Sequence, residues 1–191
     1  MSDFSAVVPQ LPPEAPVLDL SGSDVKPMER SGPWSIGRYD EVRGIYTSEL
    51  FSDGRTLHVG IDIGGPVGTK VCAFTACRIY ALGNLTAEGD YGHVVVTEQV
   101  VEGRTLWALF GHLSAASVEK WSVGDVVTSG EVLGWFGDES ENGGWPPHLH
   151  LQLSWIRPEG VDIPGVVRPD QRAWALENYP DPRMVLGNLY E

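Results

Sequence analysis

The sequence predicts an all-β protein, built as an antiparallel β-sheet or a β-sandwich-like fold, with one short helical segment near the C-terminus. The chain of 191 residues contains 23 glycines and 14 prolines, which is typical of a fold with many turns. Between these turn residues lie short runs in which apolar and polar residues alternate, as in half-buried strands. Hydrophobic residues make up 42% of the chain, enough for the core of one domain.

Eight strands are expected in the order of the chain. They lie near residues 55–63, 69–74, 77–82, 92–99, 104–112, 123–128, 131–137 and 148–155. The run Leu106-Trp107-Ala108-Leu109-Phe110 is apolar on both faces, which predicts a strand in the middle of a sheet. The only stretch that reads as a helix lies near Gln171–Asn178.

The two ends of the chain differ in composition. Residues 1–30 are rich in proline and show little periodicity, which predicts an N-terminal arm that is disordered or becomes ordered only on contact. Residues 31–191 are expected to form a single domain, whose motifs lie within residues 55–155. The segment from Gly37 to Thr47 is expected to pack on that domain.

Four of the five histidines fall in three short elements, which are His58-Val59-Gly60-Ile61-Asp62, Gly111-His112-Leu113 and His148-Leu149-His150. Because side chains alternate along a strand, His58, Gly60 and Asp62 share one face. His148 and His150 likewise share the polar face of a half-buried strand.

A straight strand cannot bring His58 and Asp62 to one metal ion. Four residues of strand span about 13 Å, whereas ligands lie about 2 Å from the ion that they share. The chain must therefore bend between them, and Gly60 permits the bend while its missing side chain leaves room for an ion.

Histidine and aspartate are the ligand types that a catalytic zinc site uses, with three protein ligands and one position for water. A lone histidine, such as His93, is more often structural. The joint occurrence of three elements with supporting glycines and prolines favours a zinc site instead.

These three elements resemble the motifs of the lysostaphin-type zinc metallopeptidases, the LytM-like murein endopeptidases of metallopeptidase family twenty-three. The glycine-rich run after Asp62 and residues 123–134 extend the resemblance, which covers roughly residues 38–155. The resemblance implies a duplicated hybrid motif and one zinc ion with His58, Asp62 and His150 as ligands. It also implies His112 and His148 as active-site residues that do not bind the metal.

The implied reaction is hydrolysis of an amide bond, in peptidoglycan or in a small peptide, by a zinc-activated water molecule. His148 is the expected general base and His112 the expected oxyanion donor or acid, although the two roles could be exchanged. One alternative is a zinc-binding recognition or regulatory module without catalysis. A carrier domain is a second alternative, but it needs a lysine where this chain has Thr128-Ser129-Gly130.

The net charge and the absence of targeting signals bear on the binding partners and the location of the protein. The 26 acidic and 13 basic residues give a net charge of −13, which disfavours nucleic acid and anionic membrane surfaces as partners. The expected partner is a peptide or muropeptide substrate. The sequence shows no signal peptide and no membrane segment, so a cytoplasmic location is expected, with non-standard export as the alternative.

Two further features have two interpretations each. The acidic segment Asp138–Trp145 is either a solvated loop or a lip for cationic substrates, with Trp145 as a stacking wall. Cys72 and Cys77 are expected to be buried free thiols rather than part of a metal site.

Overall fold

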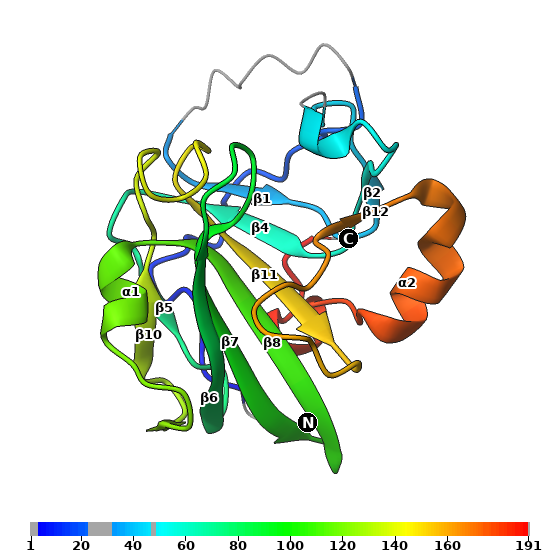
Figure 1. The fold of residues 1–191 in the computed structure, drawn as a ribbon. Helices are drawn as coiled ribbons and strands as arrows, with labels where there is room; N and C mark the ends of the chain where they lie inside the picture. The colour runs from blue at the N-terminus through cyan, green and yellow to red at the C-terminus, as the bar shows by residue number, and fades with distance from the viewer. Residues whose placement is uncertain (1–3, 23–31, 47–48, 191) are drawn as a thin grey trace.

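The computed structural model describes residues 4–22, 32–46 and 49–190, and it consists mostly of antiparallel β-sheet with a few short helices (Figure 1). The all-β prediction is therefore confirmed. The strands are β1 (Ser35–Gly37), β2 (Glu41–Val42), β3 (Leu57–His58), β4 (Ile61–Gly64), β5 (Lys70–Cys72), β6 (Cys77–Leu85), β7 (Gly92–Val101), β8 (Arg104–Leu113), β9 (Val126–Val127), β10 (Val132–Trp135), β11 (His148–Ser154) and β12 (Val166–Val167). The helices are η1 (Glu49–Phe51), α1 (Ala115–Glu119), η2 (Pro169–Gln171), α2 (Arg172–Asn178) and α3 (Arg183–Leu186).

A seven-stranded sheet in the order β1-β4-β11-β8-β7-β6-β9 forms the frame of the molecule (Figure 1). Strand β8 lies between β11 and β7, as its two apolar faces predicted. Each of the eight expected strands is present. The first of them is divided at Val59–Gly60 into β3 and β4, which belong to different sheets, since β3 pairs with β2 and β12 in a three-stranded sheet.

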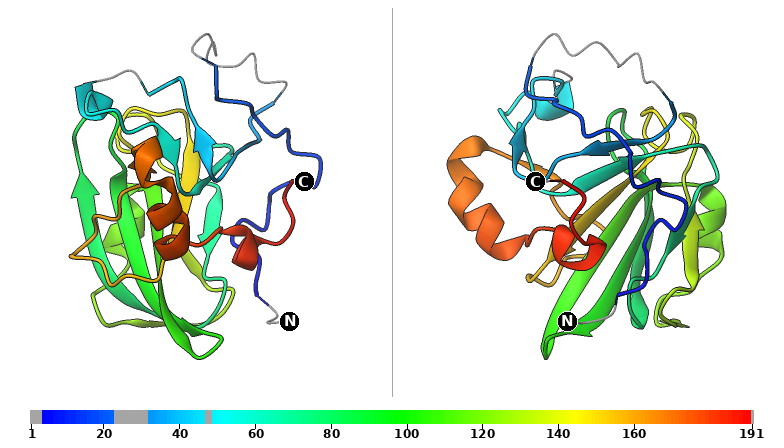
Figure 2. Two further views of the ribbon diagram at one scale, coloured as in Figure 1. Left: turned by 90° about the vertical axis from the view of Figure 1, so that its right-hand side faces the viewer. Right: turned by 180° about the vertical axis from the view of Figure 1, so that it is seen from behind.

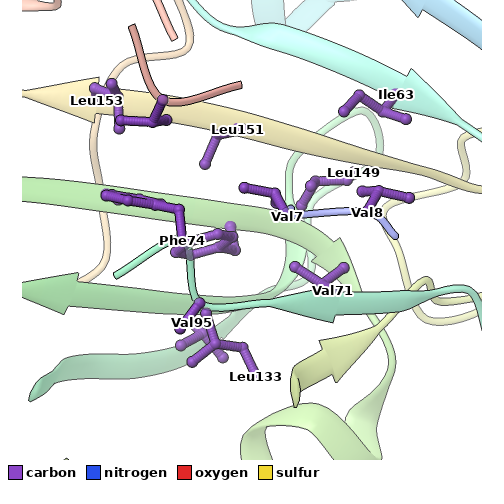
Figure 3. Packing of buried hydrophobic residues seen from close by; sticks show 14 of the residues in the cluster. Val7, Val8, Ile63, Val71, Phe74, Val95, Leu133, Leu149, Leu151 and Leu153 are labelled. Atoms are coloured by element: carbon purple, nitrogen blue, oxygen red, sulfur yellow. The ribbon is translucent and has the colours of Figure 1, made fainter. Parts of the chain in front are cut away.

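The larger core lies between one face of this sheet and the pair β5-β10. Leucines of β11, Val71 of β5 and Leu133 of β10 all belong to this core (Figure 3). The N-terminal arm joins this layer, because Ser5 N–H donates to the Phe74 carbonyl and Cys72 N–H donates to the Val7 carbonyl. Residues 4–22, the described part of the arm, thus run along the sheet and contribute buried side chains to the core (Figure 2).

A second, smaller core lies on the opposite face of the sheet, under α2 and the connection from β11 to β12. This layer corrects the expectation that β11 is half-buried, because its polar face is covered as well. Gln152 and Ser154 are both buried. The connection can cover them because it satisfies their polar groups: the Gln152 amide donates to the Pro164 carbonyl and the Ser154 hydroxyl to the Ile156 carbonyl.

The helix expected near residues 171–178 is confirmed as α2, but the prediction that it is the only one is wrong. Helices α1 and α3 also form, with five and four residues. Segments this short complete scarcely more than one turn, so no helical period becomes visible in the sequence. The strands β1, β2 and β12 were not predicted, because two or three residues are too few to show the alternation of a strand.

Cys72 and Cys77 are both buried and unpaired, as predicted. Over the described part of the chain, no helix has the length and apolar character needed to cross a membrane.

Candidate metal centre

The bend at Gly60 places His58 and Asp62 on either side of a strand break. Strand β3 ends at His58, and β4 begins at Ile61. A Cβ atom on Gly60 would lie 2.4 Å from Cε1 and 2.6 Å from Nε2 of His150. The room that the glycine leaves is therefore filled by the ring of His150 rather than kept open for an ion.

Strand pairing brings His150 to Asp62, because these two residues are direct partners in the β11–β4 register. Oδ1 of Asp62 lies 2.9 Å from Nδ1 of His150 and 3.3 Å from Nε2 of His58. The two ring nitrogens are 3.1 Å apart, and both histidines are buried. The three residues predicted as ligands thus offer one atom each within 4.8 Å of one another.

The outer nitrogens of the two rings fix the tautomers. Nδ1 of His58 donates to the Arg38 carbonyl at 2.8 Å, since a carbonyl can only accept. The Gln152 side chain donates its NH₂ to the Pro164 carbonyl, so its oxygen faces Nε2 of His150 at 3.2 Å and accepts that proton. In the neutral state, each ring therefore turns its remaining lone pair towards Asp62.

With both rings in this neutral state, three electron-pair donors converge on one point. Burial lowers the pKa of His58 to about 4, so this ring is neutral at pH 7. Burial alone would raise the pKa of Asp62, but the neighbouring His58 and the Arg43 guanidinium hold this pKa well below its usual range. Two imidazoles and one carboxylate match the donor set of a catalytic zinc site, so these residues fit the metal.

Arg43 is a site residue that the sequence analysis missed. Its Nη1 donates to Oδ2 of Asp62 at 2.6 Å, so this oxygen is occupied and Oδ1 is left for the histidines. The alternation in Glu41-Val42-Arg43 predicts that Val42 faces the core, so the sequence carried no signal for Arg43. In the structure Val42 is 49% exposed, whereas Glu41 and Arg43 are 7% and 2% exposed.

His112 and His148 form a second pair beside the ligands. Their ring centroids are 4.1 Å apart, and the His112 ring lies 6.3 Å from that of His150. Nδ1 of His112 donates to the Asn142 carbonyl and Nδ1 of His148 to the Pro146 carbonyl, each at 2.8 Å. Burial lowers the pKa of both rings, so each keeps a lone pair on Nε2 that can accept a proton.

All five predicted site residues line one cleft of about 1000 Å³. Four aromatic side chains also line it, those of Tyr46, Phe51, Tyr91 and Trp145. The backbone of His112 adopts a φ of 60°, which is uncommon for a residue other than glycine and is found most often at functional sites.

The acidic segment Asp138–Trp145 is more than a solvated loop. Asn142 is fully buried and holds the ring of His112 through its carbonyl, while Trp145 lines the cleft. His93 lies outside the cleft lining, and its Nδ1 donates to the Glu141 carbonyl at 3.0 Å. The structure thus places His93 among the supports of this segment rather than with the other four histidines.

Comparisons with known proteins place this geometry in context. The family model of peptidase family M23 matches residues 56–163. No curated protein matches the chain in sequence. Among solved structures, the catalytic domain of the prophage-encoded M23 protein EnpA from Enterococcus faecalis, studied as a mutant, is 25% identical with a TM-score of 0.49, covering 72% of this chain and 90% of its own.

Two further structures show similar values. The catalytic domain of lysostaphin from Staphylococcus simulans is 22% identical with a TM-score of 0.46, and the match covers 69% of this chain and 80% of lysostaphin's. LytU is 22% identical with a TM-score of 0.45, covering 86% of this chain and 98% of its own.

Proposed function

The chain belongs to peptidase family M23, and from this membership we propose that it is a zinc-dependent metalloendopeptidase that hydrolyses a peptide amide bond. The observation that carries the proposal is the convergence of three lone pairs, from His58, Asp62 and His150, beside two neutral histidines in one cleft. Residues 31–191 would act as one peptidase domain, with one zinc ion.

The tautomers of His112 and His148 leave a lone pair on each Nε2, so both rings can take part in proton transfer. Zinc, when bound by His58, Asp62 and His150, supplies a Lewis acid that activates water and polarises the substrate carbonyl. Nε2 of His148 accepts the proton of the attacking water, and this same proton reaches the leaving amine through Nε2 of His112. Because both rings donate Nδ1–H to backbone carbonyls, the reverse assignment uses the same geometry.

The proposed substrate is a peptide of the peptidoglycan type, a muropeptide or another small peptide. A cleft of about 1000 Å³ lies at the upper end of the range for small-molecule sites, so it can hold several residues of an extended peptide. Aromatic side chains on its wall offer apolar contact area to such a chain.

Two neutral histidines beside the ligand set favour catalysis over the alternative of a zinc-binding recognition module. Zinc retention alone does not require His112 or His148, whereas proton transfer does. The carrier alternative also fails to account for Asp62, since a carrier domain needs no metal.

A metal measurement with a matched activity assay tests the proposal. The protein is purified without chelator, and bound metal is measured by elemental mass spectrometry in the wild type, in Asp62→Ala and in His148→Ala. About one zinc per chain is expected in the wild type and in His148→Ala but none in Asp62→Ala. With a panel of peptides and muropeptides, turnover in His148→Ala should fall by roughly 10²–10⁴-fold.

The outcomes separate the hypotheses. Zinc that remains stoichiometric in Asp62→Ala would refute the ligand set. Zinc in the wild type without hydrolysis of any peptide or muropeptide would favour the recognition module.

A further inference from the structure

Two buried charges, Arg43 and Glu41, lie beside the predicted ligand Asp62. Arg43 is 2% exposed and Glu41 7% exposed, while Val42 between them faces solvent. This order inverts the usual pattern of a surface strand, in which apolar side chains face inwards. Burying two charges costs several kcal/mol each before their attraction offsets it, so an ion pair of this kind is weak evidence of a purely stabilising role.

The Arg43 guanidinium holds four groups at once. Its Nη1 donates to Oδ2 of Asp62 at 2.6 Å and to the Tyr46 hydroxyl at 2.9 Å. Its Nε donates to Oε2 of Glu41 at 3.1 Å, and its Nη2 donates to the Arg38 carbonyl at 3.3 Å. These contacts fix the plane of the guanidinium and so fix the direction from which it meets Asp62.

The same short segment also orients a second ligand. The Arg38 carbonyl that accepts from Arg43 accepts Nδ1–H of His58 as well, at 2.8 Å. Strand pairing adds a backbone tie, because Glu41 is the direct partner of His58 in the β2–β3 register. Residues 38–43 therefore contact both His58 and Asp62.

The N-terminal arm completes this support. Leu20 N–H donates to Oε1 of Glu41 at 3.1 Å, and Gly44 N–H donates to the Leu20 carbonyl at 3.0 Å. Leu20 is itself buried. A continuous chain of hydrogen bonds thus runs from the arm through Glu41 and Arg43 to Asp62.

We infer that Arg43 is a positioning residue of the metal centre, and that Glu41, held by Leu20 of the N-terminal arm, positions Arg43. This inference rests on the proposed zinc site. Arg43 occupies Oδ2 of Asp62, so only Oδ1 faces the two ligand histidines. Hydrogen bonds to ligating carboxylates orient them, and their loss weakens metal binding by about 10–100-fold.

Glu41 has an electrostatic part in this arrangement. An arginine beside a ligand carboxylate would cancel its charge and repel a dication. With Glu41 at 3.1 Å from Arg43, the charges of Glu41, Arg43 and Asp62 sum to −1, so the centre keeps a negative charge that attracts a zinc ion.

The test compares zinc affinity in the full-length wild type, Arg43→Lys, Glu41→Gln and a control. Lysine keeps the charge, but its single ammonium cannot reproduce the planar fork that reaches both carboxylates. The control is Arg183→Lys, because Arg183 also pairs with an aspartate, Asp181, through Nε and Nη2, but this pair lies outside residues 38–43 and makes no hydrogen bond to a ligand. Zinc affinity is measured by competition with a chromophoric chelator, and folding of the metal-free proteins by circular dichroism.

The expected result is a loss of about 10–100-fold in zinc affinity for Arg43→Lys, a smaller loss for Glu41→Gln and no change for Arg183→Lys. The visible spectrum of the Co²⁺-loaded protein adds a readout that a purely structural role would not move. Release of Oδ2 in Arg43→Lys allows it to approach the ion, which raises the coordination number and weakens the Co²⁺ absorption relative to the wild type.

Each outcome bears on a distinct statement. If folded Arg43→Lys binds zinc as tightly as the wild type, Arg43 does not position the metal centre, and the inference is overturned while the proposed function stands. Should Arg43→Lys not fold, Glu41→Gln decides, since it leaves Asp62 paired, and an unchanged zinc affinity there would overturn the inference. Absence of zinc binding in the wild type would overturn the proposed function together with the inference.

Discussion

Gly60→Ala is the smallest substitution that should disrupt the metal centre without removing a ligand. The added Cβ would lie 2.4 Å from Cε1 of His150, whereas ordinary contacts begin at 3.4 Å, so the ring must move by about 1 Å (3.4 − 2.4). The Leu151 carbonyl, 2.9 Å away, blocks relief by a shift of the new methyl group. Gly60 does not have a positive φ, so the substitution adds contact strain rather than backbone strain.

The magnitude follows from this displacement. Zinc–ligand distances tolerate deviations of about 0.2 Å, so a ring moved by about 1 Å no longer serves as a ligand. We expect zinc affinity to fall by more than about 100-fold, which corresponds to more than about 2.7 kcal/mol. Overpacking should also lower the free energy of unfolding of the metal-free protein by about 1–3 kcal/mol.

Two assays and one control separate these effects. Zinc affinity is measured by competition titration, and stability by urea unfolding of the metal-free protein. Gly134→Ala is the matched control, since its Cβ would lie 2.6 Å from Ser117, away from the three ligands. It should lose stability but bind zinc like the wild type. Wild-type affinity in folded Gly60→Ala would refute the reasoning, because it would show that the ring position of His150 does not depend on Gly60.

Three further predictions concern the same cleft. Gln152→Leu removes the acceptor that fixes the tautomer of His150, so zinc affinity should fall by about 10–100-fold, and equal affinity would contradict this role. In the metal-free protein, the pKa of His58 is about 4, whereas in an unfolded chain it is about 6.5. Because the unfolded chain binds this proton more readily, the free energy of unfolding is highest above about pH 6.5 and decreases as the pH falls below it. The free energy of unfolding in urea should be lower at about pH 5.5 than at about pH 7.5 by at least about 1.4 kcal/mol. His112 adds to this loss, because its pKa is also lowered by burial. Equal free energies of unfolding at the two pH values would contradict the prediction. If His112 protonates the leaving amine, His112→Ala should lose less activity on an amide with a weakly basic leaving group than on an ordinary peptide, while His148→Ala should lose as much on both.

Most strands of the large sheet were predictable, because the pattern of apolar and polar residues that specifies a strand lies within the strand itself. The run from Leu106 to Phe110 is apolar on both faces, and a strand with that pattern has to be covered on both sides. The eight expected strands lie where the alternation placed them. By contrast, the cover on the polar face of β11 depends on a connection that starts after the strand ends, so the pattern of the strand alone could not reveal it.

The candidate site also has features that the sequence predicted and features that only the fold revealed. Residue types and spacing selected His58, Asp62, His112, His148 and His150, and the required bend at Gly60 followed from the length of a straight strand. The sequence could not show that the ring of His150 fills the space beside Gly60. The two residues are far apart in the chain and meet only through the β11–β4 pairing.

The sequence by itself determined the chemical identity of the donors and the strands that carry them. Only the tertiary structure decided which atom of each donor faces the centre. That choice depends on the outer partner of each group: the Arg38 carbonyl for His58, Gln152 for His150 and Arg43 for Asp62. Two of these partners, Arg38 and Arg43, lie about twenty residues away from their ligands in the chain, and a hydrogen bond has no sequence period, so only folding reveals it.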